Sequence, residues 1–185
     1  MATAPHARTL YEALEALPEG VTGEIVDGQL YAMPRPSGRH GLATSNINVD
    51  VGNAYSRGRG GPGGWWIIVE PEVHFVRDRE LVVPDLAGWR RSRMPDVPDD
   101  QRFEVVPDWV CEVASKSTAS YDRNVKMPLY ARYRVRHAWL VDVVARRLET
   151  YALDGDRWRE IGTFDGGSPI RVAPFDEVEI APPWE

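Results

Sequence analysis

The sequence predicts a single α/β or α+β domain over residues 1–185, in which helices flank a mixed central sheet with additional β-hairpins. The chain has 185 residues, of which 43% are hydrophobic, so it can form one full-sized core but not two ordinary ones. Segments with helical periodicity alternate with strand-like apolar runs, an order typical of helices packed on a mixed sheet. We see no internal repeat and no linker that would divide the chain.

The N-terminal part is expected to contain a short helix, a hairpin and a longer helix. Thr9 and Glu12 have the spacing of a capping box, and leucines follow at helical intervals. Asp27-Gly28 lies between two apolar runs, which predicts a two-residue hairpin turn. Residues 42–55 carry apolar side chains at a roughly helical period, which predicts a second helix.

The rest of the chain is expected to be mostly strand, interrupted by one long helix. Strands are expected at 65–70, 72–76, 81–89, 108–114, 137–143, 168–172 and 177–180, and a further hairpin around Asp154-Gly155-Asp156. Residues 118–135 have a helical pattern that contains Pro128. Because an interior proline removes a hydrogen bond and clashes with the preceding turn, the regular helix should begin near Asn124 or kink.

Composition excludes several classes of protein. Cys111 is the only cysteine, which excludes an intramolecular disulfide and a cysteine zinc cluster, and which fits a reducing, cytoplasmic location. We find no leader and no run of about 18 apolar residues, so we expect neither secretion nor a membrane partner. The glycines of 57–64 lack the Lys-Ser/Thr ending of a phosphate-binding P-loop.

The charge distribution is uneven. The net charge of −6 argues against a protein whose whole surface binds nucleic acid. Residues 116–147, however, contain eight basic and two acidic side chains. This segment fits a local phosphate-facing surface, and on charge alone it fits a solvated arginine-rich helix face equally well.

A carboxylate in an apolar run is the first indication of chemistry. Glu112 lies in the middle of the strand-like run "WVCEVA", where an uncompensated charge would be expensive. Asp85 likewise follows an apolar run and Pro84, which favours an edge strand, a bulge or a strand end. Two such carboxylates on neighbouring strands would repel unless a cation lay between them, and Mg²⁺ or Mn²⁺ is the natural candidate.

These residues resemble a known motif. Pro84-Asp85 followed by Glu112 is similar to the PD-(D/E)xK nuclease superfamily, although Ala114 stands where that pattern has lysine. The segments "VPDL", "EVAS", "ST", "D...K..LY" and "V.HAWLVD" together resemble the bacterial Uma-type branch, in which the lysine has moved onto the following helix. The likeness spans roughly residues 10–143. It implies a restriction-endonuclease-like fold.

The resemblance also implies roles for individual residues. Asp85 and Glu112 match the metal-binding carboxylates, with the backbone carbonyl of Val113 as a further ligand, and Lys126 matches the migrated lysine. Glu24, in "GEIVDGQL", is the expected third acid.

Some assignments have rivals. Lys116 competes with Lys126, and Glu72 competes with Glu24 for the third acidic position. His40, in "GRHG", lies where the branch often has a histidine, and with Lys116 it is a candidate for substrate binding.

Each of these residues also has an ordinary structural interpretation. Asp85 could be a turn former after proline, and Glu112 could pair with an arginine in a buried ion pair. Lys126 could be a solvated helix residue, and His40 could cap or pack.

The sequence departs from the branch at two places. Arg134 replaces a glycine before the valine that leads into the last core strand, which puts a left-handed helix cap there in doubt. His137-Ala138 replaces the usual Glu-Tyr. Neither position belongs to the expected site.

Three functions follow from these observations. The leading hypothesis is a Mg²⁺- or Mn²⁺-dependent endodeoxyribonuclease that acts on DNA, with a homodimer expected because both strands of a duplex must be cut. The alternative is an inactive nuclease-like module for binding or assembly, suggested by the missing lysine at position 114. Glycoside hydrolysis by the paired acids ranks third, because a proton-donating acid needs no accompanying lysine.

Overall fold

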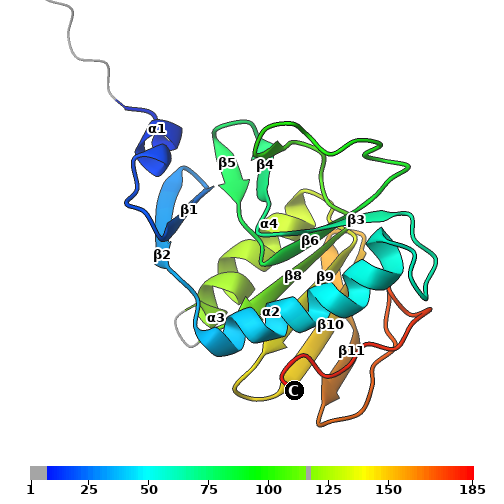
Figure 1. Cartoon of the computed structure of the whole chain (residues 1–185). Coiled ribbons are helices and arrows are strands. Elements are labelled where there is room, and N and C mark those ends of the chain that lie inside the picture. The colour runs from blue at the N-terminus through cyan, green and yellow to red at the C-terminus, as the bar shows by residue number, and fades with distance from the viewer. Residues whose placement is uncertain (1–7, 116–117) are drawn as a thin grey trace, which may run out of the picture.

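The strands of the chain are divided between two sheets (Figure 1). The structure is a computed structural model that describes residues 8–115 and 118–185. In chain order its elements are α1 (Leu10–Glu15), β1 (Val21–Val26), β2 (Gln29–Pro34), α2 (Gly38–Val51), η1 (Gly52–Ser56), β3 (Trp65–Val69), β4 (Glu72–Val76), β5 (Glu80–Val82), β6 (Leu86–Arg90), β7 (Arg102–Phe103), β8 (Trp109–Ala114), α3 (Ala119–Tyr121), η2 (Asp122–Lys126), α4 (Met127–Arg132), β9 (His137–Asp142), β10 (Arg147–Asp154) and β11 (Arg157–Asp165).

Both sheets are mixed. One has six strands in the order β11-β10-β9-β8-β6-β3, and the other has five in the order β2-β1-β5-β4-β7. The pairs β8–β9 and β4–β7 are parallel, and the remaining pairs are antiparallel. The mixed α+β class predicted from the sequence is thus confirmed, with the strands shared between two sheets rather than one.

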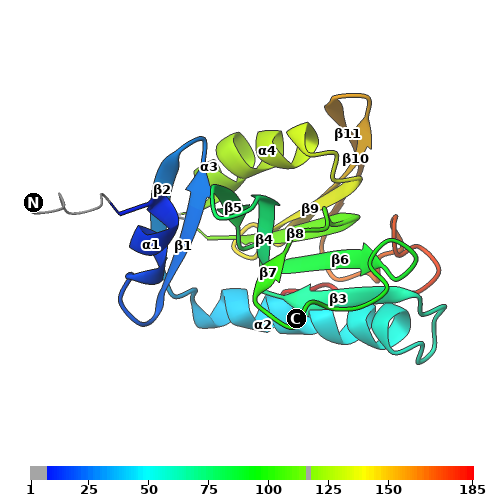
Figure 2. The ribbon, with the colours of Figure 1, turned by 90° about the horizontal axis from the view of Figure 1, so that it is seen from above.

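The six-stranded sheet lies between two helical layers, with α2 on one face and α3, η2 and α4 on the other (Figure 2). Alternate residues of β8 face these layers as the strand period requires. Trp109 and Cys111 pack in the cluster that contains Ile47 of α2, whereas Val110 packs with Leu129 of α4. Glu112 therefore projects from the α4 face of the sheet.

The N-terminal elements follow the sequence prediction. Thr9 and Glu12 form both bonds of the capping box at the start of α1. Asp27 and Gly28 have φ values of 49° and 73°, which suit the tight turn of the β1–β2 hairpin. Helix α2 begins at Gly38, earlier than expected, because the Ser37 side chain accepts a hydrogen bond from His40 and caps it.

Three expected strands differ from the structure. The run 81–89 is broken at Pro84, so β5 ends at Val82, β6 begins at Leu86, and Asp85 lies in the break. The predicted strands at 168–172 and 177–180 are wrong, since only an isolated bridge between Ile170 and Ile180 forms there. The C-terminal segment instead inserts Phe175 among buried aromatic rings, including those of Trp109 and Trp139.

The helix expected at 118–135 contains a π turn. The N–H of Met127 bonds to the carbonyl of Asp122, five residues earlier, and Pro128 follows without a donor of its own. Pro128 led us to expect an interruption of this helix, and the π turn is that interruption. Single π turns of this kind occur inside otherwise α-helical segments. Within the described ranges, none of the helices is both long and apolar enough to cross a membrane.

Helix α4 ends in a Schellman motif at a non-glycine residue. Val135 N–H bonds to Tyr130 carbonyl and Arg134 N–H to Ala131 carbonyl, and Arg134 has φ 66°. The left-handed cap therefore forms although glycine is absent.

We expect Arg134→Gly to raise the free energy of unfolding by about 0.5–1 kcal/mol, because it removes a left-handed conformation at a residue with a Cβ. The lost ion pair with Asp156 is exposed and should contribute little. Urea unfolding measures the change. Arg136→Gly, two residues further along the chain, is the control and should lower stability; a loss of equal size in both variants would contradict the strain argument.

Candidate active site

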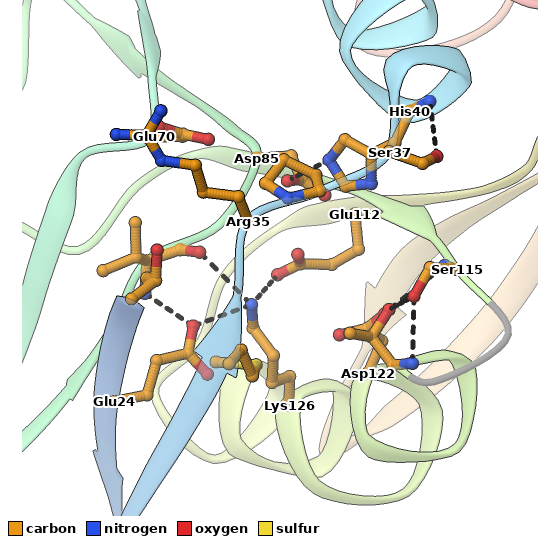
Figure 3. A pocket seen from close by; sticks show the side chains of 15 residues that line it. Glu24, Arg35, Ser37, His40, Glu70, Asp85, Glu112, Ser115, Asp122 and Lys126 are labelled. Carbon is orange, nitrogen blue, oxygen red and sulfur yellow. Dashed lines mark hydrogen bonds and ion pairs between the residues drawn. The ribbon is translucent and has the colours of Figure 1, made fainter. Parts of the chain in front are cut away.

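The residues expected to carry chemistry meet in one cavity. It has a volume of about 300 Å³ and lies where β1, the β5–β6 break, β8, the first turn of α2 and η2 converge (Figure 3). Its charged or titratable lining residues are Glu24, Arg35, His40, Glu70, Asp85, Glu112, Asp122 and Lys126.

Lys126 is the partner that the buried Glu112 requires. Its Nζ atom lies 2.8 Å from Glu112 Oε1 and 3.0 Å from Glu24 Oε1. All three residues are almost completely buried, with exposed fractions of 0% for Glu24, 2% for Glu112 and 3% for Lys126. The Tyr130 hydroxyl donates a further hydrogen bond to Glu112 Oε1. Glu112 thus pairs with a lysine and not with an arginine, and Lys126 is buried and not a solvated helix residue.

Glu24 is fixed by the neighbouring strand. The N–H of Val83 donates to Glu24 Oε1 over 2.8 Å, and the Val83 carbonyl lies 3.4 Å from Lys126 Nζ. Glu24 Oε2 is buried and accepts no hydrogen bond from the described residues. A buried carboxylate oxygen without a partner is unusual in a folded protein.

Asp85 is held from three directions. Its Oδ1 lies 2.7 Å from His40 Nε2, and its Oδ2 accepts the Val113 N–H over 2.6 Å. Its carbonyl accepts the N–H of Glu70, a residue with φ 47°. Because the N–H and C=O of one strand residue point to the same side, the Val113 carbonyl also faces the Asp85 side of β8.

The cavity carries an excess of negative charge. Its five carboxylates are opposed by the permanently charged Arg35 and Lys126, which leaves a formal charge of −3 when His40 is neutral. Burial raises the pKa of Glu112 well above its ordinary value, and Lys126 offsets this only in part because Asp122 and Asp85 act in the same direction as burial. A bound cation would relieve this excess.

Two further groups respond to these charges. Burial alone would lower the pKa of His40, but the contact with Asp85 and the nearby Glu70 raise it above its ordinary value. Burial would likewise lower the pKa of Lys126, but Glu112 and Glu24 raise it well above its ordinary value. Lys126 is therefore an ammonium ion in the folded protein.

The structure brings most of the predicted site residues together. Asp85, Glu112, Val113, Lys126, Glu24 and His40 all lie at the cavity or directly against its lining. Glu72 does not, since it binds the His74 ring and the Tyr11 hydroxyl in the other sheet. Lys116 lies outside the described residues.

Sequence reasoning missed Asp122 and Glu70. Asp122 lies one turn before Lys126 in η2 and lines the same cavity. It is the "D" of the segment "D...K..LY", which was a usable signal, but an aspartate on a helix has many ordinary explanations. Glu70 was missed because nothing in the sequence indicates its left-handed backbone.

Most arginines in the described part of the basic segment 116–147 lie within 4.0 Å of a carboxylate. Arg123 pairs with Glu149, and Arg132 pairs with Asp27 and Glu80. Arg134 and Arg147 likewise have carboxylates within 4.0 Å. Since acids from distant parts of the chain neutralise these arginines, the phosphate-facing interpretation loses its support.

The lining residues fit a hard divalent cation in type and charge. Within 8–115 and 118–185, no three His, Cys, Asp or Glu side chains converge as a complete metal cage would require. Mg²⁺ does not need such a cage, because it keeps several waters and binds through one or two carboxylates and substrate phosphate oxygens. Asp85, Glu112 and the Val113 carbonyl supply oxygen donors of the required kind, and each carboxylate oxygen retains a further lone pair.

Comparisons with known proteins agree with this geometry. A family model named Uma2 and described as "Putative restriction endonuclease" matches residues 9–182. A crystal structure of a putative nuclease belonging to DUF820 from Anabaena variabilis ATCC 29413 superposes with a TM-score of 0.71 and 21% sequence identity, covering 95% of this chain and 96% of that chain. At this identity the likeness shows the fold alone. None of the curated proteins matches the chain.

Proposed function

We propose that this chain, which belongs to the Uma2 family of putative restriction endonucleases, hydrolyses phosphodiester bonds of DNA with the help of a divalent metal ion. One observation supports this proposal above the others. Asp85 and Glu112, far apart in the sequence, line one cavity together with a buried lysine. Among the described residues neither carboxylate pairs with an arginine: Glu112 contacts Lys126 and Asp85 contacts His40, and the cavity as a whole keeps a formal charge of −3 that a cation can offset.

The protein groups have distinct roles in this proposal. Asp85, Glu112 and the Val113 carbonyl would hold Mg²⁺ or Mn²⁺, which when bound polarises the phosphate and lowers the pKa of a water ligand. Lys126 supplies a fixed positive charge toward the negative charge that develops on the phosphate. Glu24 holds the Lys126 ammonium in place and is thus a positioning residue.

The mouth of the cavity suits a phosphate backbone. Arg35 lines it, and no carboxylate of the described residues forms an ion pair with its guanidinium. Ser37 and His40 bring the N-terminus of α2 to the same wall, and helix N-termini favour anions. Arg35 can therefore contact a DNA phosphate beside the one that is cleaved.

The direct test is cleavage of DNA by the purified protein. Supercoiled plasmid and labelled duplex and single-stranded oligonucleotides should be cut in the presence of Mg²⁺ or Mn²⁺ and left intact when EDTA is added. An absence of cutting on every nucleic acid, together with an absence of Mg²⁺ binding through Asp85 and Glu112, would favour the inactive binding or assembly module instead.

Metal binding is a separate prediction. Mg²⁺ should stabilise the folded protein by about 2.7 kcal/mol when its free concentration is 100 times the Kd, because only the folded state presents the site. Thermal unfolding and calorimetric titration measure this effect. Asp85→Asn should abolish it, since the amide can still accept the Val113 N–H but cannot neutralise a cation. Asp165→Asn, at an exposed position of β11, should bind Mg²⁺ like the wild type; identical titrations for all three proteins would contradict the assigned site.

A further inference from the structure

The cavity contains a carboxylate to which the reaction proposed above assigns no role. Asp122 is 5% exposed and lines the cavity from η2. Figure 3 shows it on the helical side of the cavity, across from Glu24. Within the described part of the chain it forms no ion pair, although Lys126 lies on the same π turn.

Hydrolysis requires a group that accepts a proton from the attacking water, and Lys126 cannot do this. An ammonium group has three N–H donors and no acceptor. Lys126 directs these donors at Glu24 Oε1 over 3.0 Å, Glu112 Oε1 over 2.8 Å and the Val83 carbonyl over 3.4 Å. Each N–H thus has an acceptor, so the observed contacts need the fully protonated lysine.

The other buried acids are committed to existing partners. Glu112 accepts from Lys126 and Tyr130, and both oxygens of Asp85 are bonded, one to His40 and one to the Val113 N–H. Each of these carboxylates already has a structural task in the folded protein.

Two remaining atoms without partners are closed to solvent. Glu24 Oε2 and His40 Nδ1 are both buried with almost no accessible surface, so an attacking water cannot reach them. Glu70 is exposed at the rim. Asp122 is thus the carboxylate that lies inside the cavity and keeps its oxygens free of ion pairs.

We propose that Asp122 is the general base of the reaction, an inference that rests on the proposed nuclease function. Its carboxylate takes a proton from the attacking water as the water oxygen forms a bond to phosphorus. One ester P–O bond breaks, and its electron pair stays on the departing oxygen, which takes a proton from solvent. Asp122 then releases its proton to solvent, so that one water is consumed for each bond cut.

The surroundings of Asp122 suit this task. Burial raises its pKa to about 6, while Lys126 and the Thr118 hydroxyl oppose the rise. Asp122 also interacts electrostatically with four groups on the elements packed around it. These are Glu24 of β1, Asp85 between β5 and β6, Glu112 of β8 and His40 of α2. A base with a pKa near the working pH combines sufficient basicity with a large deprotonated fraction. Because only the deprotonated carboxylate accepts a proton, activity should rise as the pH increases through about 6.

The test compares Asp122→Asn with the wild type in steady-state cleavage of a labelled duplex at saturating Mg²⁺, from pH 5 to pH 9. We expect kcat to fall by about 10²-fold or more, with KM and the calorimetric Mg²⁺ affinity changed less than about threefold. The rise of log kcat near pH 6 should disappear. Asp122→Ala should regain part of the lost rate when formate is added, because a small carboxylate can enter the space left by the side chain.

Controls separate this inference from the proposed function. Asp165→Asn should cut at the wild-type rate, and Glu70→Gln should keep the rise near pH 6. If the wild type cuts and Asp122→Asn cuts equally well with the same pH profile, the general-base role is wrong while the nuclease function stands. A loss of Mg²⁺ affinity in Asp122→Asn that accounts for the whole rate defect would also overturn it, as would failure of formate to restore any activity. A wild-type protein that cuts no nucleic acid would overturn both.

Discussion

Glu112→Gln is expected to lower the rate of DNA cleavage by at least about 10²–10³-fold. The amide has nearly the shape of the carboxylate and can still accept the hydrogen bond from Tyr130. It cannot, however, neutralise a divalent cation, and it weakens the contact that holds Lys126. Glutamine is preferable to alanine here, because Glu112→Ala would leave a cavity and an incompletely paired buried lysine.

The measurements for Glu112→Gln are single-turnover cleavage, Mg²⁺ titration and circular dichroism. Glu72→Gln provides a matched control. Like Glu112, Glu72 is a strand carboxylate that accepts a hydrogen bond from a tyrosine hydroxyl, but it lies in the other sheet and its second partner is the His74 ring. We expect Glu72→Gln to cut normally. Wild-type activity in Glu112→Gln, or an equal loss in Glu72→Gln, would remove Glu112 from the reaction.

The central features of the site could be predicted from the sequence because they follow from the free-energy cost of burying a charged side chain. A carboxylate within an apolar strand must have a compensating partner, and this reasoning identified Glu112 before any geometry was known. It left two lysines as candidates. The structure places Lys126 against Glu112 through the π turn of η2, whose hydrogen bonding depends on Pro128 and on packing of α4 against the sheet. Neither condition can be read from residue spacing alone.

Other features depend on contacts between distant residues. The run 81–89 reads as one strand, and only the break at Pro84 shows that its halves belong to different sheets. The arginines of 116–147 look like a positive surface until tertiary structure pairs them, as Arg132 does with Asp27 and Glu80. Sequence predicts which residues need partners, whereas the fold determines which partners they obtain.

Lys126→Met is expected to lower the free energy of unfolding by about 3–5 kcal/mol at pH 8, because it leaves Glu24 and Glu112 buried with uncompensated charge. The loss should diminish as the pH falls. Burial raises the pKa of Glu112 well above its ordinary value, and without the lysine this rise is opposed less. The folded state therefore binds a proton more readily than the unfolded state and gains stability at lower pH. Adding Glu112→Gln to Lys126→Met should recover part of the stability by removing one of the two charges.

Urea unfolding of these variants at pH 8 and pH 5 measures the effect directly. Arg159→Met, at an exposed position of β11, is the control, and it should change stability by less than about 0.5 kcal/mol and leave cleavage intact. Equal stability of Lys126→Met and the wild type at pH 8 would mean that Lys126 compensates no buried negative charge there. The site would then lack the negative charge on which both the metal and the lysine depend, and the proposed hydrolysis would lose its electrostatic basis.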